Sequence, residues 1–248
     1  MQIGRLLGQG RVAEVFEAGA DVIKLYRAGV GPEQARHEAT ILDALRHLDL
    51  MVPRSLGVVQ IDGRWGLLMT RMPGRPLGET MLAAADPSGE VVLLADLHRQ
   101  MHRHSAPELV PLKTRLADRL ARVRQLSEAE RAGLLERLAA LPDGDRLCHG
   151  DFHPFNIMID GDRAGIIDWL DATSGPPEAD VARTYLLALH NLPTLAEPYL
   201  AARLRGAAFD RQDIAAWLPV LAGARLAENV PEEDERLLAL VRGLRSDI

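Results

Sequence analysis

Short apolar runs alternate with glycine-bearing turns along the first third of the chain. Runs of this length, rich in β-branched and aromatic residues and bounded by Gly or Asp, predict β-strands. The dipeptide Asp62-Gly63 between the last two runs is typical of a tight hairpin turn. The pattern predicts strands at residues 3–7, 12–18, 22–26, 58–61 and 65–70.

A helical pattern interrupts these runs between the third and the fourth. It begins at Pro32 and continues with apolar residues at positions 35, 39, 41, 42 and 45, which is the spacing of one helix face. Pro53 ends the connection that follows. The first part of the chain is therefore predicted to form an antiparallel sheet that carries one helix.

Beyond residue 76 the chain becomes rich in Ala, Leu and Arg, and its apolar residues recur at helical spacing. The preceding segment, 72–76, contains two prolines and a glycine and is predicted to be a linker. We expect an N-terminal lobe at 1–71 and a mainly helical C-terminal lobe at 72–248. Helices are predicted at 77–84, 89–104, 112–124, 128–141, 179–190, 193–205, 214–227 and 231–244, with two short strands among them.

Composition excludes several classes of protein. A chain of 248 residues with 47% hydrophobic content can form one large domain or two small lobes. The net charge of −6 argues against nucleic-acid and anionic-membrane partners. No secretion-signal pattern or apolar stretch long enough to cross a membrane is present, and the single cysteine, Cys148, excludes an internal disulfide. We expect a cytoplasmic protein, and the oligomeric state is not indicated.

The candidate chemistry is concentrated in two motifs, HGDFHPFN at 149–156 and IIDW at 166–169. Asp151 and Asn156 have the spacing of the kinase catalytic loop, and Asp168 follows Asn156 by twelve residues. Three such oxygen-bearing side chains can orient and deprotonate a hydroxyl and hold magnesium on a nucleoside triphosphate. Each motif alone is also compatible with a polar hairpin turn, because Asp, Asn and Pro are ordinary turn residues.

The two motifs resemble those of the aminoglycoside phosphotransferase and choline kinase family. That family has His-Gly-Asp-x-x-x-x-Asn, and its metal aspartate lies within Ile-Asp-Trp or Ile-Asp-Phe, whereas protein kinases have Arg at the place of Gly150 and Phe-Gly at that of Trp169-Leu170. The resemblance implies an α+β, protein-kinase-like bilobal fold with ATP and Mg²⁺ as cofactors. It also implies that Asp151 accepts the proton of a substrate hydroxyl, and that Asn156 and Asp168 are magnesium ligands.

A glycine-rich segment lies between the first two predicted strands. The sequence GQGRVAEV at 8–15 resembles the kinase G-x-G-x-x-G-x-V loop, with Ala13 at the place of the third glycine. At Gly8 and Gly10 the backbone is expected to approach phosphate groups. A plain glycine hairpin is the alternative, but a Rossmann loop is excluded because it requires a helix after the strand.

Lys24 is one of only two lysines in the chain and follows the apolar residues Val22 and Ile23. It resembles the kinase third-strand lysine of V-A-I-K, and Glu38 follows fourteen residues later on the predicted helix. An ion pair between them would direct the ammonium group at the α- and β-phosphates. A surface lysine and a solvated helix face are the alternatives.

The exit from the fifth predicted strand resembles the family's hinge. By that resemblance Met69 would lie behind the adenine, and the Thr70 carbonyl and the Met72 amide would bind its edge. An ordinary end of a strand is the alternative, because recognition through the backbone leaves little trace in side-chain identity.

Three further residues are assigned supporting roles. Asp180 matches a family aspartate that braces the catalytic loop through backbone hydrogen bonds, although a helix N-cap would explain it as well. By the resemblance His149 shapes the loop by packing and hydrogen bonding. Asp171 either faces the substrate or is a turn acid.

Two other groups of polar residues leave alternatives open. His98 and His102 share one helix face, and we interpret them as partly exposed imidazoles near a helix end because the sequence supplies no matching acid. A late acidic cluster can either bind a cationic amine or form a solvated helix start, and the second is favoured. It comprises Glu228, Glu232, Glu233, Asp234 and Glu235.

These observations predict an ATP-dependent phosphotransferase that moves the γ-phosphate to a hydroxyl of a small molecule, such as an aminoglycoside-like compound, an amino alcohol or a sugar. One alternative is a catalytically idle nucleotide-binding module with the same fold. Another is a protein kinase, which Gly150, Trp169 and the lack of an Ala-Pro-Glu motif argue against.

Overall fold

The computed structural model describes residues 3–243 and divides them into two compact units. The first unit contains residues 3–79 and 155–171, and the second contains residues 80–154 and 172–243. The chain therefore returns to the first unit for seventeen residues after leaving it. This excursion places Asn156, Asp168 and Asp171 in the same unit as the N-terminal sheet.

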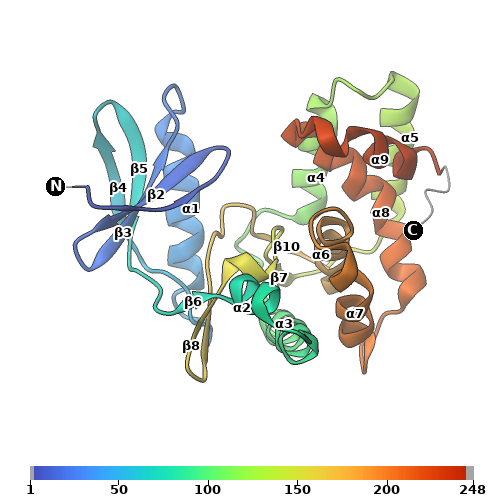
Figure 1. Ribbon diagram of the computed structural model, residues 1–248. Helices are drawn as coiled ribbons and strands as arrows, with labels where there is room; N and C mark the ends of the chain where they lie inside the picture. The colour runs from blue at the N-terminus through green and yellow to red at the C-terminus, as the bar shows by residue number, and fades with distance from the viewer. Residues whose placement is uncertain (1–2, 244–248) are drawn as a thin grey trace. The chain divides into compact units, whose positions relative to one another are not determined.

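The first unit is built on a five-stranded antiparallel sheet, as the sequence predicts (Figure 1). Its order is β1-β2-β3-β5-β4, so β2, β3 and β5 are paired on both sides, and β3 and β5 are the most buried strands. The strands are β1 (Leu6–Gln9), β2 (Ala13–Ala18), β3 (Asp21–Tyr26), β4 (Ser55–Ile61) and β5 (Arg64–Met69). The first strand begins three residues later than predicted.

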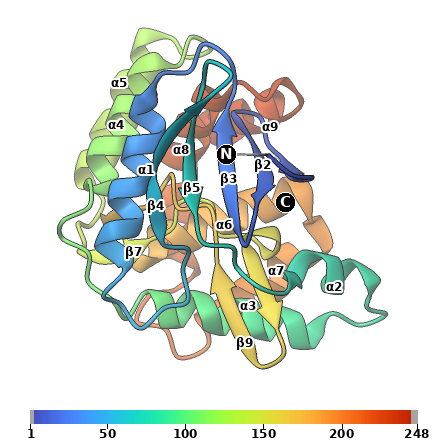
Figure 2. The same cartoon turned by 90° about the vertical axis from the view of Figure 1, so that its left-hand side faces the viewer.

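The helix α1 (Pro32–Leu45) packs against β4 and β5. Gly31 precedes it as the N-cap and Pro32 occupies the first turn, where the missing N–H of proline has no intrahelical partner to lose. Figure 2 shows α1 running along the sheet beside β4. The buried face consists of Ala35, Glu38, Ile41, Leu42 and Leu45, so a single carboxylate lies in an otherwise apolar stripe.

A second sheet in the first unit joins the segment after β5 to the excursion. Its order is β6-β8-β9, formed by β6 (Arg75–Pro76), β8 (Ile157–Asp160) and β9 (Arg163–Ile166). The predicted linker 72–76 thus ends in a short strand that is paired with β8. Gly74 allows this because its φ is +96° and its Cα lies too close to the Ile159 carbonyl for a side chain to fit.

The second unit is mainly helical. The helix α2 (Leu77–Ala83) leads into it, and two short 3₁₀ segments are η1 (Pro154–Asn156) and η2 (Leu226–Glu228). The other helices are α3 (Ser88–Met101), α4 (Leu112–Arg122), α5 (Glu128–Ala140), α6 (Pro177–Asn191), α7 (Pro193–Leu204), α8 (Arg211–Arg225) and α9 (Pro231–Val241). The predicted helix end at residue 244 lies outside the described residues.

The core of the second unit is centred on α6, in which ten of fifteen residues are buried. It packs against α7 and α8, and α3 packs against α7. A two-stranded sheet of β7 (Arg146–Cys148) and β10 (Thr173–Gly175) lies next to α6 and α4. With β8 and β9 this makes four strands between residues 146 and 175, where the sequence predicted two, because three-residue strands carry too short a pattern to be recognised. No helix within residues 3–243 is long and apolar enough to cross a membrane.

Candidate active site

One group of candidate residues, in the first unit, is organised around Lys24 on β3. Its Nζ lies 3.0 Å and 2.9 Å from the two carboxylate oxygens of Glu38 and 2.6 Å from Oδ1 of Asp168. The side chain is only 7% exposed. Burial acts to lower the pKa of Lys24, but the two carboxylates outweigh it and hold the pKa well above its usual value. The ammonium group therefore remains charged at any physiological pH.

Glu38 has a further partner that the sequence analysis missed. The Tyr26 hydroxyl, two residues along β3 on the same face as Lys24, donates a 2.7 Å hydrogen bond to Oε2 of Glu38. Burial and the nearby carboxylate raise the pKa of Tyr26, so the hydroxyl keeps its proton and donates it to the hydrogen bond with Glu38. The i, i+2 spacing of Tyr26 and Lys24 was the available signal, because alternate residues of a strand share a face.

Asp168 follows β9 after a single residue and has a φ of +62°, which is the left-handed region. Aspartate tolerates this region better than most residues, but such positions concentrate at functional sites. Its side chain is 45% exposed, whereas Lys24 and Glu38 are buried. The carboxylate thus connects the buried ion pair to solvent.

A cavity of about 480 Å³ lies in the first unit, within the range of roughly 300–1,000 Å³ that is usual for small-molecule sites. Most of the residues predicted for the nucleotide line it, namely Gly8, Lys24, Glu38, Met69, Thr70 and Met72, together with Asp168, which was predicted for magnesium. Gly10 is not part of the lining; its amide donates to the Ala13 carbonyl across the β1–β2 turn. Lys24, Glu38 and Asp168 thus line the same cavity as the end of β5.

Asn156 lies at the end of the 3₁₀ turn η1 (Pro154–Asn156) and is 7% exposed. Its carbonyl accepts a 2.9 Å hydrogen bond from the Ile167 amide, which extends the β8–β9 hairpin by one step. Asn156 and Asp168 therefore lie at the same end of one hairpin. An amide oxygen and a carboxylate are ligands of the kind that Mg²⁺ prefers, so these residues fit a magnesium site.

A second group of candidate residues belongs to the loop that follows β7 in the second unit. The His149 amide donates to Oδ2 of Asp180 and the Gly150 amide donates to Oδ1, each at 2.8 Å. Asp180 lies in the first turn of α6, but Pro176 is the N-cap, so the carboxylate does not cap its own helix. It binds the two loop amides instead, and Gly150 adopts a φ of +79° directly after the second amide.

The side chains of this loop surround Asp151. The Asp151 amide donates to Nδ1 of the buried His149 at 3.2 Å, and Oδ2 of Asp151 lies 3.5 Å from Nε2 of His153. Burial acts to raise the pKa of Asp151, but the hydrogen bond from His153 and the charge of Arg183 hold it well below its usual value. Asp151 is therefore ionised at neutral pH.

Arg183 on α6 is a further residue that the sequence analysis missed. Its Nε donates to the Gly150 carbonyl at 3.1 Å and its Nη2 donates to Glu228 at 2.6 Å. It follows Asp180 by three residues, so one helix turn presents an acceptor to the loop amides and a donor to the loop carbonyl. This spacing was the signal in the sequence.

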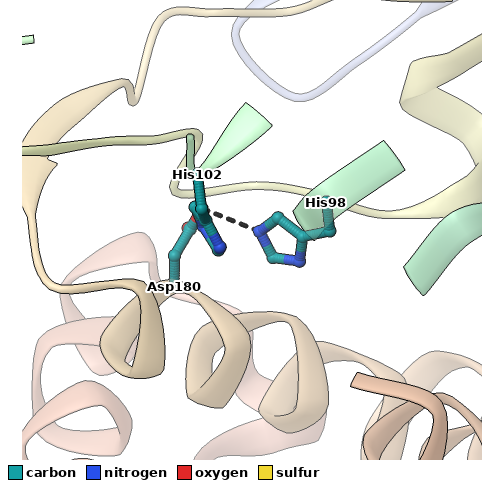
Figure 3. Close-up of side chains that lie close together, drawn as sticks. All are labelled: His98, His102 and Asp180. Carbon is teal, nitrogen blue, oxygen red and sulfur yellow. Dashed lines mark hydrogen bonds and ion pairs between the residues drawn. The ribbon is translucent and has the colours of Figure 1, made fainter. Parts of the chain in front are cut away.

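His98 and His102 are buried and not partly exposed, which corrects the sequence-based interpretation. Both rings lie beside Asp180, as Figure 3 shows, with Nε2 at 2.9 Å and 3.2 Å from Oδ2. The missing acid is thus supplied from about eighty residues away. The contact between these histidines and Asp180 arises from the packing of α3 and α6 in one unit, so the sequence alone does not show it.

The late acidic cluster is divided by the fold. Glu232 and Glu235 are exposed, as expected of a solvated helix start. Glu233 is buried and accepts two 2.8 Å hydrogen bonds from Arg225, and Glu228 forms ion pairs with Arg183 and Arg225. These two carboxylates are neutralised within the protein and are not presented to a cationic ligand.

The structure places the predicted residues in two groups. The nucleotide residues, Asn156 and Asp168 belong to the first unit, together with Asp171 in the turn after Trp169. Asp151, His149 and Asp180 belong to the second unit. The division falls after Pro154, so the motif 149–156 is continuous across it.

A protein-family model matches most of the chain. The model of a family described as the phosphotransferase enzyme family matches residues 4–217. No curated protein matches the chain by sequence.

Several solved structures share the fold. One is a thermostable mutant of aminoglycoside phosphotransferase APH(4)-Ia in a ternary complex with ADP and hygromycin B, with 15% identity, a TM-score of 0.66, and coverage of 98% of this chain and 91% of that one. Another is the choline kinase LicA from Streptococcus pneumoniae, with 16% identity, a TM-score of 0.65, and coverage of 98% and 93%. A third is aminoglycoside phosphotransferase APH(3'')-Id from Streptomyces rimosus, with 24% identity, a TM-score of 0.56, and coverage of 86% and 89%.

The chain belongs to the phosphotransferase enzyme family. Its fold is the kinase-like α+β fold of aminoglycoside phosphotransferases and choline kinases, which confirms the fold class predicted from the sequence.

Proposed function

We propose that this protein is an ATP-dependent kinase that transfers the γ-phosphate to a hydroxyl of a small molecule. The observation that carries the proposal is the position of the Lys24 ammonium between Glu38 and Asp168 in the wall of the cavity. A cation held by a buried glutamate can pair with the α- and β-phosphates of a nucleotide. The related APH(4)-Ia and LicA structures contain ADP and AMP respectively, which supports a nucleotide as the ligand of this cavity.

In the proposed reaction, Asp151 holds the substrate hydroxyl and accepts its proton as the oxygen attacks the γ-phosphorus. The new O–P bond forms while the bond from the γ-phosphorus to the β–γ bridging oxygen breaks, and ADP leaves. Because the transition state of phosphoryl transfer is loose, orientation matters more than basicity, so a carboxylate with a depressed pKa suffices.

Asn156 and Asp168 would hold magnesium, and the ion would neutralise charge on the triphosphate. The placement of both residues at one end of the β8–β9 hairpin supports this assignment. Lys24 and the backbone at Gly8 would bind the phosphates. Met69, Thr70 and Met72 would accommodate the adenine at the strand exit.

The acceptor is a small molecule with a hydroxyl group: an aminoglycoside-like compound, an amino alcohol or a sugar. Because Glu228 and Glu233 are already paired with arginines, neutral and singly charged alcohols belong in the test beside polycationic aminoglycosides. The experiment is to measure ADP release with pooled acceptors from these three groups in the presence of Mg²⁺ and ATP.

The variant Asp151→Asn tests the assigned role. We expect it to abolish transfer and to leave magnesium-dependent ATP binding, measured by calorimetry, nearly unchanged, because Asp151 belongs to a different unit from the cavity residues. Loss of ATP affinity in this variant would contradict the role of Asp151. ATP binding to the native protein without turnover on any acceptor would instead favour an idle nucleotide-binding module.

A further inference from the structure

The carboxylate of Asp180 accepts hydrogen bonds from four donors in the interior of the second unit. Oδ1 accepts from the Gly150 amide, and Oδ2 accepts from the His149 amide and from two imidazoles, those of His98 and His102. Asp180 is 2% exposed, so these donors replace water around a buried charge. Two of them belong to the loop that carries Asp151, and the other two are His98 on α3 and His102, the residue at the C-cap of α3.

The hydrogen bonds determine the tautomers of both rings. Each Nε2 faces a carboxylate oxygen and must carry the proton, which leaves each Nδ1 as an acceptor. The Tyr199 hydroxyl lies 2.6 Å from Nδ1 of His98, and Nη2 of Arg203 lies 3.1 Å from Nδ1 of His102. Both second partners are donors, so neutral imidazoles satisfy every contact in the cluster.

Two histidines and an aspartate are also a combination that can bind a metal ion. The possible ligand atoms of His98, His102 and Asp180 lie within 4.8 Å of one another. A metal ion would need the Nε2 lone pairs, and this would move the ring protons to Nδ1. In His102 that proton would then face the N–H of Arg203, and a second cation would lie beside the guanidinium. The donors around the cluster therefore favour the hydrogen-bonded arrangement over a metal.

We infer that His102 is a positioning residue: it connects the buried guanidinium of Arg203 to Asp180 and so holds the Asp180 carboxylate in the one orientation that binds both loop amides. Arg203 is 2% exposed. The His102 imidazole accepts a hydrogen bond from Arg203 at Nδ1 and donates one to Asp180 from Nε2. His98 and Tyr199 form a second, parallel link to the same oxygen. The loop amides precede Asp151 directly, so the position of Asp151 depends on this carboxylate.

The inference rests on the proposed function only for its kinetic consequence. We expect His102→Leu to lower kcat by about 10- to 100-fold, because a small misplacement of a reacting group has effects of that size. The KM for ATP should change by less than about twofold, since the cavity residues belong to the other unit. His102→Gln, whose amide can still donate to Asp180, should recover most of the lost kcat.

Two control variants separate positioning from general destabilisation. His104→Leu changes a histidine two residues further on that lies outside the cluster and should leave kcat unchanged. Leu138→Ala removes a buried side chain of α5 and should lower the melting temperature without changing kcat. If His102→Gln is as impaired as His102→Leu, or if kcat simply follows the melting temperature across the variants, the inference is overturned.

Hydrogen exchange tests the link without any activity. The amides of His149 and Gly150 should exchange faster in His102→Leu and stay protected in His104→Leu and Leu138→Ala under native conditions. Unchanged protection in His102→Leu would refute the link even if turnover is never found, whereas absence of turnover with the expected exchange pattern would refute only the proposed function. Zn²⁺ added alone should not raise the melting temperature of the native protein, and a rise that His102→Leu abolishes would identify a metal site instead.

Discussion

The Nζ atom of Lys24 lies 2.6 Å from Oδ1 of Asp168, although 144 residues separate the two in the chain. The contact joins the central strand of the first sheet to the turn after β9, both within the first unit. It gives the ammonium two acidic partners of different exposure, since Glu38 is buried and Asp168 is half-exposed. Asp168, the more exposed of the two, is the partner whose carboxylate is accessible to a ligand.

Replacing Lys24 by Arg should abolish most turnover while preserving the fold. Arginine keeps the positive charge and can still pair with Glu38, but its planar guanidinium does not reproduce a compact ammonium between two carboxylates. We expect ADP release to fall by about 100-fold or more, with little change in melting temperature. The matched control is Lys113→Arg, which changes the only other lysine, in an ion pair with the exposed Asp143. Near-native turnover in Lys24→Arg would remove the role assigned to Lys24.

Removing the Tyr26 hydroxyl should destabilise the first unit. Tyr26→Phe leaves the buried carboxylate of Glu38 with one donor fewer, and a hydrogen bond to a charged group typically contributes about 1.5–3 kcal/mol. Urea denaturation should show a lower free energy of unfolding by about that amount. The effect should largely disappear in the background Glu38→Gln, because the charged acceptor is then absent. Equal losses in both backgrounds would show that Tyr26 acts through packing alone.

Stability should decrease as the pH falls below about 6.5. Burial lowers the pKa of His98 and His102, and the charge of Arg203 adds to this effect, while Asp180 opposes it. Below pH 6.5 these two histidines are therefore protonated in the unfolded chain but stay neutral in the folded protein. As the pH falls, the free energy of unfolding decreases by up to about 1.4 kcal/mol per pH unit for each histidine. The pKa of Asp180 is also lowered, but the stability that its carboxylate contributes is lost only below pH 3.8.

Urea denaturation between pH 7.5 and 5 measures this dependence. The variant His102→Gln removes one of the two histidines and should give a shallower slope below pH 6.5 than the native protein. A slope that is the same in both proteins would show that other groups are responsible for the acid destabilisation.

Gly74→Ala should destabilise the β6–β8 pairing far more than Gly161→Ala. Both glycines have positive φ values, of +96° and +60°, so both substitutions introduce backbone strain of about 1 kcal/mol. Only at Gly74 would the new methyl group also collide with the backbone at Ile159, whereas nothing lies within 4 Å of the corresponding position at Gly161. Thermal unfolding should therefore show a clearly larger loss for Gly74→Ala. Equal losses would indicate that the two segments are not packed as described.

Local sequence patterns were sufficient for β2, β3 and α1 of the first unit, but not for β6, which lies in the segment predicted to be a linker. The short apolar runs of β2 and β3, and Pro32 at the start of α1, predicted these boundaries to within about a residue. The two motifs around Asp151 and Asp168 indicated the family, because their chemistry requires fixed residue types at fixed spacing. Short strands such as β7 and β10 were not foreseen, since three residues carry almost no periodic signal.

Only the tertiary structure decided which side chains meet over long distances in the chain. The sequence by itself determined that His98 and His102 share a helix face, but the acid between them belongs to α6, and their burial follows from that packing. It likewise determined an acidic cluster, but not that Glu228 and Glu233 are neutralised by arginines from α6 and α8. The physical reason is that desolvation and pairing of charges depend on neighbours in space, whereas secondary structure and motif spacing depend on neighbours in the chain.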